Sequence, residues 1–124
     1  MTTRNLQELA LAVMHRLSSS DIQDSAVGAR ELAIITNRYE EKFAELKFEG
    51  LTYWTSTAIP LEVFNAIVRI VAHEAAAPLG EAIPEEQEVD GSGPAQQIGV
   101  IGMKMLRKHM RRRMSGQPTV GEYF

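Results

Sequence analysis

The chain has 124 residues, of which 44% are hydrophobic and 23% charged, and its formal net charge is −3. This length fits one domain, and the composition is typical of a folded globular protein rather than a disordered one. The absence of cysteine excludes disulfide bridges, thiolate zinc sites and thiol nucleophiles. Polar residues interrupt the longest apolar stretch, and the N-terminus lacks the pattern of a signal peptide. We therefore expect a soluble cytoplasmic protein without a membrane span.

The charge is divided unevenly along the chain. Residues 1–94 carry 15 acidic and 7 basic side chains, whereas residues 95–124 carry one acid and six bases. Such a split favours two faces with different neighbours, and one candidate neighbour is the next copy of the same chain. The alternative interpretation is that the acidic body only keeps the protein in solution.

Two helices are predicted in the first half of the chain. Over residues 4–18, apolar side chains recur at helical spacing, and Asn5 with Glu8 resembles a capping pair. A second and longer helix is predicted over residues 21–48, where Gly50 is expected to stop it in a left-handed conformation. Because the connection between them is short, we expect two antiparallel neighbours.

The middle of the chain combines an extended connection with a third helix. Residues 51–58 are rich in β-branched and aromatic side chains, which favours extended backbone. In one interpretation Tyr53 and Trp54 cap the open end of a helical bundle, and in the other they are candidate interface aromatics. The third helix begins at Pro60, whose missing N–H suits a first helical position, and ends near Gly80. Its broad apolar stripe predicts the most buried helix.

An acidic loop and a basic helix are predicted to follow. Residues 81–94 contain two prolines and two glycines among acids, which predicts a long flexible or extended loop. A fourth helix is predicted over residues 95–114, where Gly99 and Gly102 mark either close approach of another backbone or weak helix. Its C-terminal half is basic almost all round and cannot pack wholly against its own domain. The basic side chains are Lys104, Arg107, Lys108, Arg111, Arg112 and Arg113.

Together these elements predict an all-α fold. We expect a four-helix bundle over residues 1–114, with a long acidic loop and an extended C-terminal tail over residues 115–124. Two glycines and a proline disfavour helix in the tail, and its apolar side chains favour docking on the bundle or on a partner. The predicted core comprises Leu9, Val13, Leu17, Leu32, Tyr39, Phe43, Phe64, Ile67, Val68 and Val71.

Catalytic and metal-binding patterns are weak in this sequence. His73 and Glu74 match the start of a zincin motif, but Ala77 stands where the second histidine is required. His73 is therefore interpreted as a satisfied, partly buried side chain. The sequence contains neither a nucleophile elbow nor a glycine-rich phosphate loop followed by lysine. We expect no enzymatic activity, no catalytic or metal-binding residues and no cofactor.

The basic run from Lys104 to Arg113 allows two interpretations. It can contact nucleic-acid phosphates, because affinity rises with each phosphate that is neutralised. A small helical nucleic-acid-binding or regulatory protein is therefore the alternative function. The run can also pair with acidic faces of a neighbouring subunit. No nucleic-acid-binding motif accompanies it and the rest of the chain is acidic, so specific DNA reading is not expected.

The order of these features resembles the phage head-to-tail adaptor proteins, also called tail accessory or head completion proteins. An N-terminal helix pair is followed by a Gly-Leu-x-Tyr-Trp connection, an Ile-Pro-x-x-x-Phe helix start and an Ala-Pro-Leu-Gly helix end. A basic fourth helix and a tail ending in Glu-Tyr-Phe complete the pattern. The segments are Gly50–Trp54, Ile59–Phe64, Ala77–Gly80 and Glu122–Phe124. They span nearly the whole chain, but each is short and none is a catalytic signature.

The resemblance implies a structural virion protein that forms a dodecameric ring on the portal and joins capsid to tail after DNA packaging. The implied partners are the portal protein, a tail or neck protein and further copies of the chain, with non-specific contact with packaged DNA. The implied location is the virion neck, reached from the host cytoplasm during assembly. In such proteins the C-terminal tail reaches into the portal. The candidate portal-binding residues are therefore Val120, Glu122, Tyr123 and Phe124.

Overall fold

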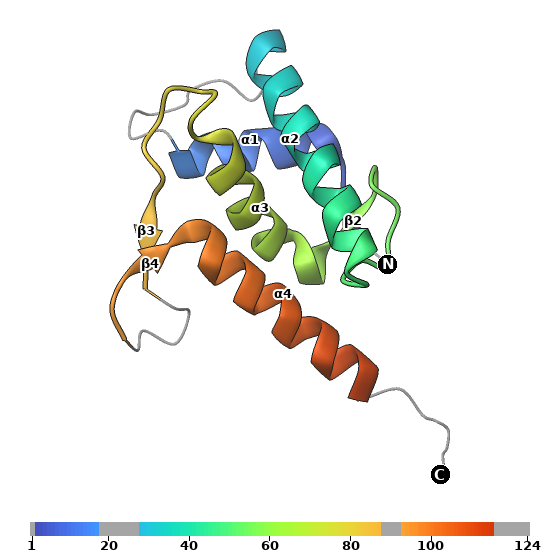
Figure 1. Cartoon of the computed structure of the whole chain (residues 1–124). Helices are drawn as coiled ribbons and strands as arrows, with labels where there is room; N and C mark the ends of the chain where they lie inside the picture. The colour runs from blue at the N-terminus through green and yellow to red at the C-terminus, as the bar shows by residue number, and fades with distance from the viewer. Residues whose placement is uncertain (1, 18–27, 88–92, 116–124) are drawn as a thin grey trace.

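The structure of the protein is a computed structural model that describes residues 2–17, 28–87 and 93–115. Four helices make up most of this part of the chain, which confirms the predicted all-α fold class (Figure 1). Two very short pairs of strands are added to the prediction. Among the described residues, no helix combines the length and the apolar character that crossing a lipid bilayer requires. The helices are α1 (Leu6–Leu17), α2 (Ala29–Phe48), α3 (Leu61–Ala75) and α4 (Ile98–Ser115).

The core forms around α3, which lies between the other helices (Figure 1). Buried residues occur on most sides of α3, whereas α1 and α2 bury single stripes. The prediction that the third helix is the most buried one is therefore confirmed. Because α3 contacts all three other helices, it fixes where their outward faces point.

Most of the predicted core is buried. Leu32, Phe43 and Phe64 pack against the core but are only partly buried, because they lie at the edges of their helical stripes. Ile35 was not predicted and is fully buried, since the stripe of α2 that faces the core is centred nearer to Ile35 than to Leu32. The predicted core residues that are buried are Leu9, Val13, Leu17, Tyr39, Ile67, Val68 and Val71.

Local capping explains where α1 begins and where α2 ends. The Asn5 side chain accepts a hydrogen bond from the Glu8 N–H, and the Glu8 carboxylate accepts one from the Asn5 N–H, both at 2.9 Å. This capping box confirms the predicted start of the first helix. At the end of α2, Gly50 has φ 77°, and the Leu51 N–H donates to the Leu46 carbonyl at 2.8 Å. The predicted glycine stop is thus a Schellman motif.

The starts of the second, third and fourth helices were predicted at earlier residues than those at which the described helices begin. The predicted residues 21–27 of the second helix lie outside the described residues. Pro60 is not the first residue of the third helix but its N-cap, with an extended ψ of 144°, and it belongs to β2 (Ile59–Pro60), which pairs with β1 (Thr3–Arg4). The fourth helix begins at Ile98 rather than at residue 95, because the two residues before it form a strand.

That strand fixes the described part of the acidic loop. β3 (Glu85–Glu86) pairs antiparallel with β4 (Gln96–Gln97), and the Ile98 N–H donates to the Pro84 carbonyl at 2.9 Å. The Glu86 carboxylate also contacts the guanidinium groups of Arg16 on α1 and Arg69 on α3. Residues 81–87 are therefore extended and attached to the bundle.

Helix α4 approaches α3 closely at its two glycines. A Cβ on Gly102 would lie 2.8 Å from the backbone oxygen of Ala66, and a Cβ on Gly99 would lie 2.6 Å from the His73 ring. Both distances are shorter than ordinary van der Waals contact allows. Close approach of another backbone, one of the two predicted interpretations, is confirmed at Gly102, whereas at Gly99 the close neighbour is the His73 side chain.

Candidate functional site

The C-terminal half of α4 extends past the other helices (Figure 1). Leu106 and Met110 of this half face the core, while its charged residues lie on the exposed sides. The prediction that the helix cannot pack wholly against its own domain is confirmed. We call the exposed set the basic end: Lys104, Arg107, Lys108, Arg111, Arg112 and Arg113.

Contacts within the chain hold two members of the basic end loosely. The Lys104 ammonium donates a hydrogen bond to the Gln96 side chain at 3.0 Å. The Arg107 guanidinium lies 4.0 Å from the Glu49 carboxylate, and both side chains are about half exposed. Exposed ion pairs contribute only about 0–1 kcal/mol, so an incoming partner can displace the Arg107 pair at little cost.

The candidate interface aromatic Tyr53 contacts the basic end directly. Its hydroxyl donates to the Glu62 carboxylate at 2.7 Å and lies 3.2 Å from Nε2 of His109. Because the single phenolic hydrogen goes to Glu62, the His109 Nε2–H must donate to the Tyr53 oxygen. The Arg113 guanidinium lies 3.7 Å from the centre of the Tyr53 ring, at cation–π distance. The connection and the basic end therefore form one polar surface.

Trp54 lies on the other side of this aromatic group, toward the core. Its Nε1–H donates to the Tyr39 hydroxyl at 3.3 Å. Its ring meets those of Tyr53 and Phe43 edge to face, with centroids 5.2 and 5.9 Å away. Trp54 and Tyr53 are both partly buried and pack against the core, as expected of residues that cap a bundle. The interface role of these aromatics stays a prediction.

The phenol of Tyr53 is expected to resist ionisation. Burial, followed by the hydrogen bond to Glu62 and its negative charge, raises the pKa of Tyr53 from 10.0 to about 12, against the opposing effect of Arg113. Burial also raises the pKa of Tyr39 to about 12. Because the pKa of Tyr53 is higher in the folded state than in the unfolded state, the neutral phenol stabilises the folded state. The contribution of Tyr53 to the free energy of unfolding is therefore complete below pH 10.0 and is lost as the pH rises through about 12.

The ionisation of Tyr53 can be followed by the ultraviolet absorbance of its phenolate form. The difference between the wild-type chain and Tyr53→Phe isolates the Tyr53 titration, which should be centred well above the ordinary value of 10.0. In urea the same difference should return to that ordinary value, which is the internal control. A folded-state difference centred at the ordinary value would contradict the described environment of the Tyr53 hydroxyl.

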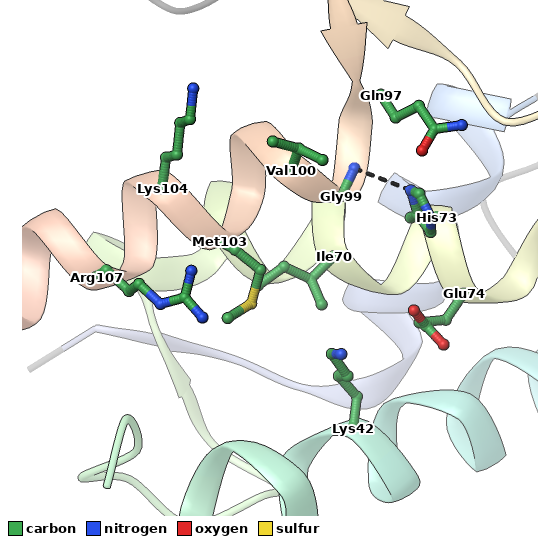
Figure 2. Close-up of a pocket in the computed structure, with 10 residues that line it drawn as sticks. All are labelled: Lys42, Ile70, His73, Glu74, Gln97, Gly99, Val100, Met103, Lys104 and Arg107. Carbon is green, nitrogen blue, oxygen red and sulfur yellow. Dashed lines mark hydrogen bonds between the residues drawn. The ribbon is translucent and has the colours of Figure 1, made fainter. Parts of the chain in front are cut away.

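A second feature is a groove of 390 Å³ between α2, α3 and α4 (Figure 2). Its apolar lining comes from Ile70 on α3 and from Val100 and Met103 on α4. Figure 2 shows Lys42 on α2 pointing toward Ile70 and Met103. The groove is thus apolar within and charged at its edges. Its polar and glycine lining residues are Lys42, His73, Glu74, Gln97, Gly99, Lys104 and Arg107.

His73 lines the groove and has a structural partner. Its Nδ1 accepts a hydrogen bond from the Gly99 N–H at 3.2 Å. Since a backbone N–H can only donate, Nδ1 carries no proton in this arrangement and any ring proton of neutral His73 is on Nε2. The prediction of a satisfied, partly buried histidine is confirmed. Within the described ranges, no three histidine or acidic side chains come together as metal ligands would.

Sequence reasoning located the basic end but not the groove. The cations are visible as a charge run, whereas the groove exists only because α2 and α4 flank α3. The one sequence signal for it was the pair Gly99 and Gly102, which indicated a close neighbour without identifying it. The candidate portal-binding residues Val120, Glu122, Tyr123 and Phe124 lie outside the described residues.

Comparison with protein-family models, curated proteins and solved structures gives no match for this chain.

Proposed function

We propose that the protein is a structural assembly protein, a phage head-to-tail adaptor that forms a ring on the portal and joins capsid to tail after DNA packaging. The observation that carries the proposal is the exposed basic end of α4, which projects from the bundle (Figure 1). The resemblance of the short segments along the sequence supports it. On this proposal the partners are the portal, a tail or neck protein and other copies, and the location is the virion neck.

The composition of the basic end favours a protein partner over nucleic acid. Four of its six cations are arginines, whose planar guanidinium groups pair bidentately with carboxylates and with phosphates alike, so the difference must come from the other residues of this end. Met114 at the same end is 68% exposed and offers apolar area that phosphate groups would not use. A surface that combines arginine with an exposed methionine fits an acidic, partly apolar protein surface.

Repetition compensates for the weakness of each contact. A single exposed ion pair contributes about 0–1 kcal/mol and is screened by salt. In a ring, every copy presents the same basic end to the same assembly, so weak contacts act together through high effective concentration. We therefore expect attachment that is firm for the ring, weak for one subunit and sensitive to ionic strength.

Reversing the charge of the basic end tests the proposal. The triple variant Arg111→Glu, Arg112→Glu and Arg113→Glu should lose attachment to purified portal while it keeps its helical circular dichroism, because all three side chains are exposed. Co-sedimentation with portal rings at several salt concentrations measures attachment. The matched control changes the same three residues to lysine, which keeps the charge and should retain most of the binding.

Two further measurements separate the alternatives. The single variant Arg113→Gln removes the contact with the Tyr53 ring but keeps Arg111 and Arg112. A full loss of portal attachment in this variant would indicate that local structure, rather than charge, is responsible. Attachment of the triple glutamate variant at wild-type strength would defeat the proposed role of the basic end. If that variant instead loses steeply salt-dependent binding to a double-stranded DNA fragment, the nucleic-acid-binding alternative gains support.

The role of the tail in this proposal rests on the resemblance alone. Val120, Glu122, Tyr123 and Phe124 are proposed as the portal anchor because tails of such adaptors reach into the portal. The basic end and the tail follow one another in the chain, so both would face the same partner.

A further inference from the structure

Phe48, the last residue of α2, is the most exposed large apolar side chain of the described residues. It is 94% exposed, while Glu45 and Glu49 beside it are 62% and 49% exposed at their side chains. The exposed Lys47 precedes Phe48, so the ring has two acids and one base as exposed charged neighbours. An aromatic ring in water contributes little to the fold of its own chain. Aromatic residues presented in this way are enriched where proteins meet.

The direction of Phe48 prevents it from filling the groove of its own chain. Buried Leu46 marks the side of α2 that faces the core, and Lys42 marks the side that borders the groove. With 3.6 residues per turn, Phe48 lies about 120° around the helix from Lys42. Phe48 therefore points away from both, and any groove that receives it belongs to another molecule.

The groove between α2, α3 and α4 has the chemistry that Phe48 requires. Val100 at its edge is 43% exposed, Met103 is partly buried, and Ile70, at 2% exposed, closes the groove from below. The lining carries three cations and one acid, so its net charge is opposite in sign to the acids that flank Phe48. These four residues are Lys42, Lys104, Arg107 and Glu74. The exposed Phe48 side chain with its acidic neighbours is thus complementary to an apolar groove whose charged lining is mainly basic.

The cations of the groove now pair with acids of their own chain, and acids of a second copy could replace them. Lys42 lies 3.5 Å from Glu45, and Arg107 lies 4.0 Å from Glu49, in pairs whose acidic side chains are about half exposed or more. Such long, solvated pairs contribute little within one chain. The same acids and bases can pair between copies when Phe48 brings them together.

We propose that Phe48 of one copy inserts into the α2–α3–α4 groove of the next copy. Because Phe48 and the groove lie on different surfaces of the same chain, the contact is heterologous and closes into a ring or grows into a filament. This inference rests on the self-association within the proposed function and deepens it, since it names the surfaces by which neighbouring copies meet.

Disulfide trapping between copies tests this arrangement, and the absence of cysteine from the sequence leaves no competing thiol. Two single variants that keep the Phe48 ring, Ala44→Cys and Val100→Cys, are purified with tags of different mass, mixed and oxidised. Ala44 is exposed and lies one turn before Phe48 on the same face of α2. The mixed disulfide is expected to exceed either homodimer at least tenfold. Thr57→Cys is the matched control, because Thr57 is exposed outside both surfaces. Its disulfide with the Val100→Cys variant should stay at the level of random collision.

Two outcomes of the trapping experiment, and one of sedimentation of the wild-type chain, overturn the proposal. If Ala44→Cys forms chiefly its own homodimer, the contact is symmetric and the groove is not the receptor. If the mixed disulfide stays at the Thr57→Cys level, or the wild-type chain remains monomeric at every concentration, Phe48 does not dock in a second copy.

Sedimentation of a second pair of variants adds an independent readout. Phe48→Ala should weaken self-association about tenfold or more, as expected of an aromatic anchor, without changing the melting temperature of the monomer. Leu61→Ala, which truncates another exposed apolar side chain, should change neither. Equal association of wild type and Phe48→Ala would contradict the proposal. Portal attachment that persists when trapping fails would leave the proposed function standing and remove only this interface.

Discussion

Replacing Ile67 with alanine is expected to lower the free energy of unfolding by about 2–5 kcal/mol. The Ile67 side chain is 1% exposed and lies on α3, where every other helix of the described chain packs. The same replacement at Phe64, one turn earlier, should cost only about 1–2 kcal/mol, since a partly exposed ring loses a fraction of the usual burial energy. One contact of the Phe64 ring is the Arg4 guanidinium, 5.9 Å from its centre.

This order reverses what residue size alone predicts. Phenylalanine removes more apolar area than isoleucine, so a helix that buried both would rank Phe64→Ala as the more damaging change. Urea unfolding followed by circular dichroism gives both values, with exposed Leu61→Ala as the control within about 0.5 kcal/mol of wild type. A cost for Phe64→Ala equal to or above that of Ile67→Ala would contradict the described packing of α3.

The features predictable from the sequence are those that depend on neighbours in the chain. The capping box of Asn5 and Glu8 and the stop at Gly50 act within one turn of helix, so composition and spacing were enough to place them. The stripe of α3 repeats at helical spacing and needs no partner to be recognised. For the same reason the basic end is visible as a run of charges.

The features missed are those that depend on which elements meet. Ile35 is buried because α2 turns a particular side toward α3, and the sequence allowed a rotation centred on Leu32 as well. The strand pair joins Glu86, inside the acidic loop, to Gln96 just after it, so no local pattern indicates it. The groove follows from the same tertiary placement. Loop composition predicted either flexible or extended backbone, and residues 81–87 are extended, with the Glu86 side chain paired to Arg16 and Arg69.

Substituting the two glycines of α4 separates a backbone contact from a side-chain contact. Alanine in place of glycine normally stabilises a helix by about 1 kcal/mol. At Gly102 the added Cβ would lie 2.8 Å from the Ala66 backbone oxygen and 3.0 Å from the Arg69 Cβ, neither of which can move without shifting α3. Gly102→Ala should therefore destabilise the protein by about 1–3 kcal/mol, the usual cost of overpacking.

At Gly99 the obstacle is the ring of His73, whose Nδ1 also holds the Gly99 N–H. Gly99→Ala should also destabilise the protein, because the ring can rotate away only at the loss of one hydrogen bond, worth about 1 kcal/mol, and the His73 Cβ stays 2.8 Å from the added Cβ. In a His73→Ala background the ring is gone but the Cβ of residue 73 remains, so the cost of Gly99→Ala should fall in part. Gly102→Ala should keep its full cost there, since the Ala66 oxygen remains. Unfolding free energies of the three single variants and both double variants measure this coupling, and equal rescue of both glycine substitutions would show that α3 and α4 do not meet as described.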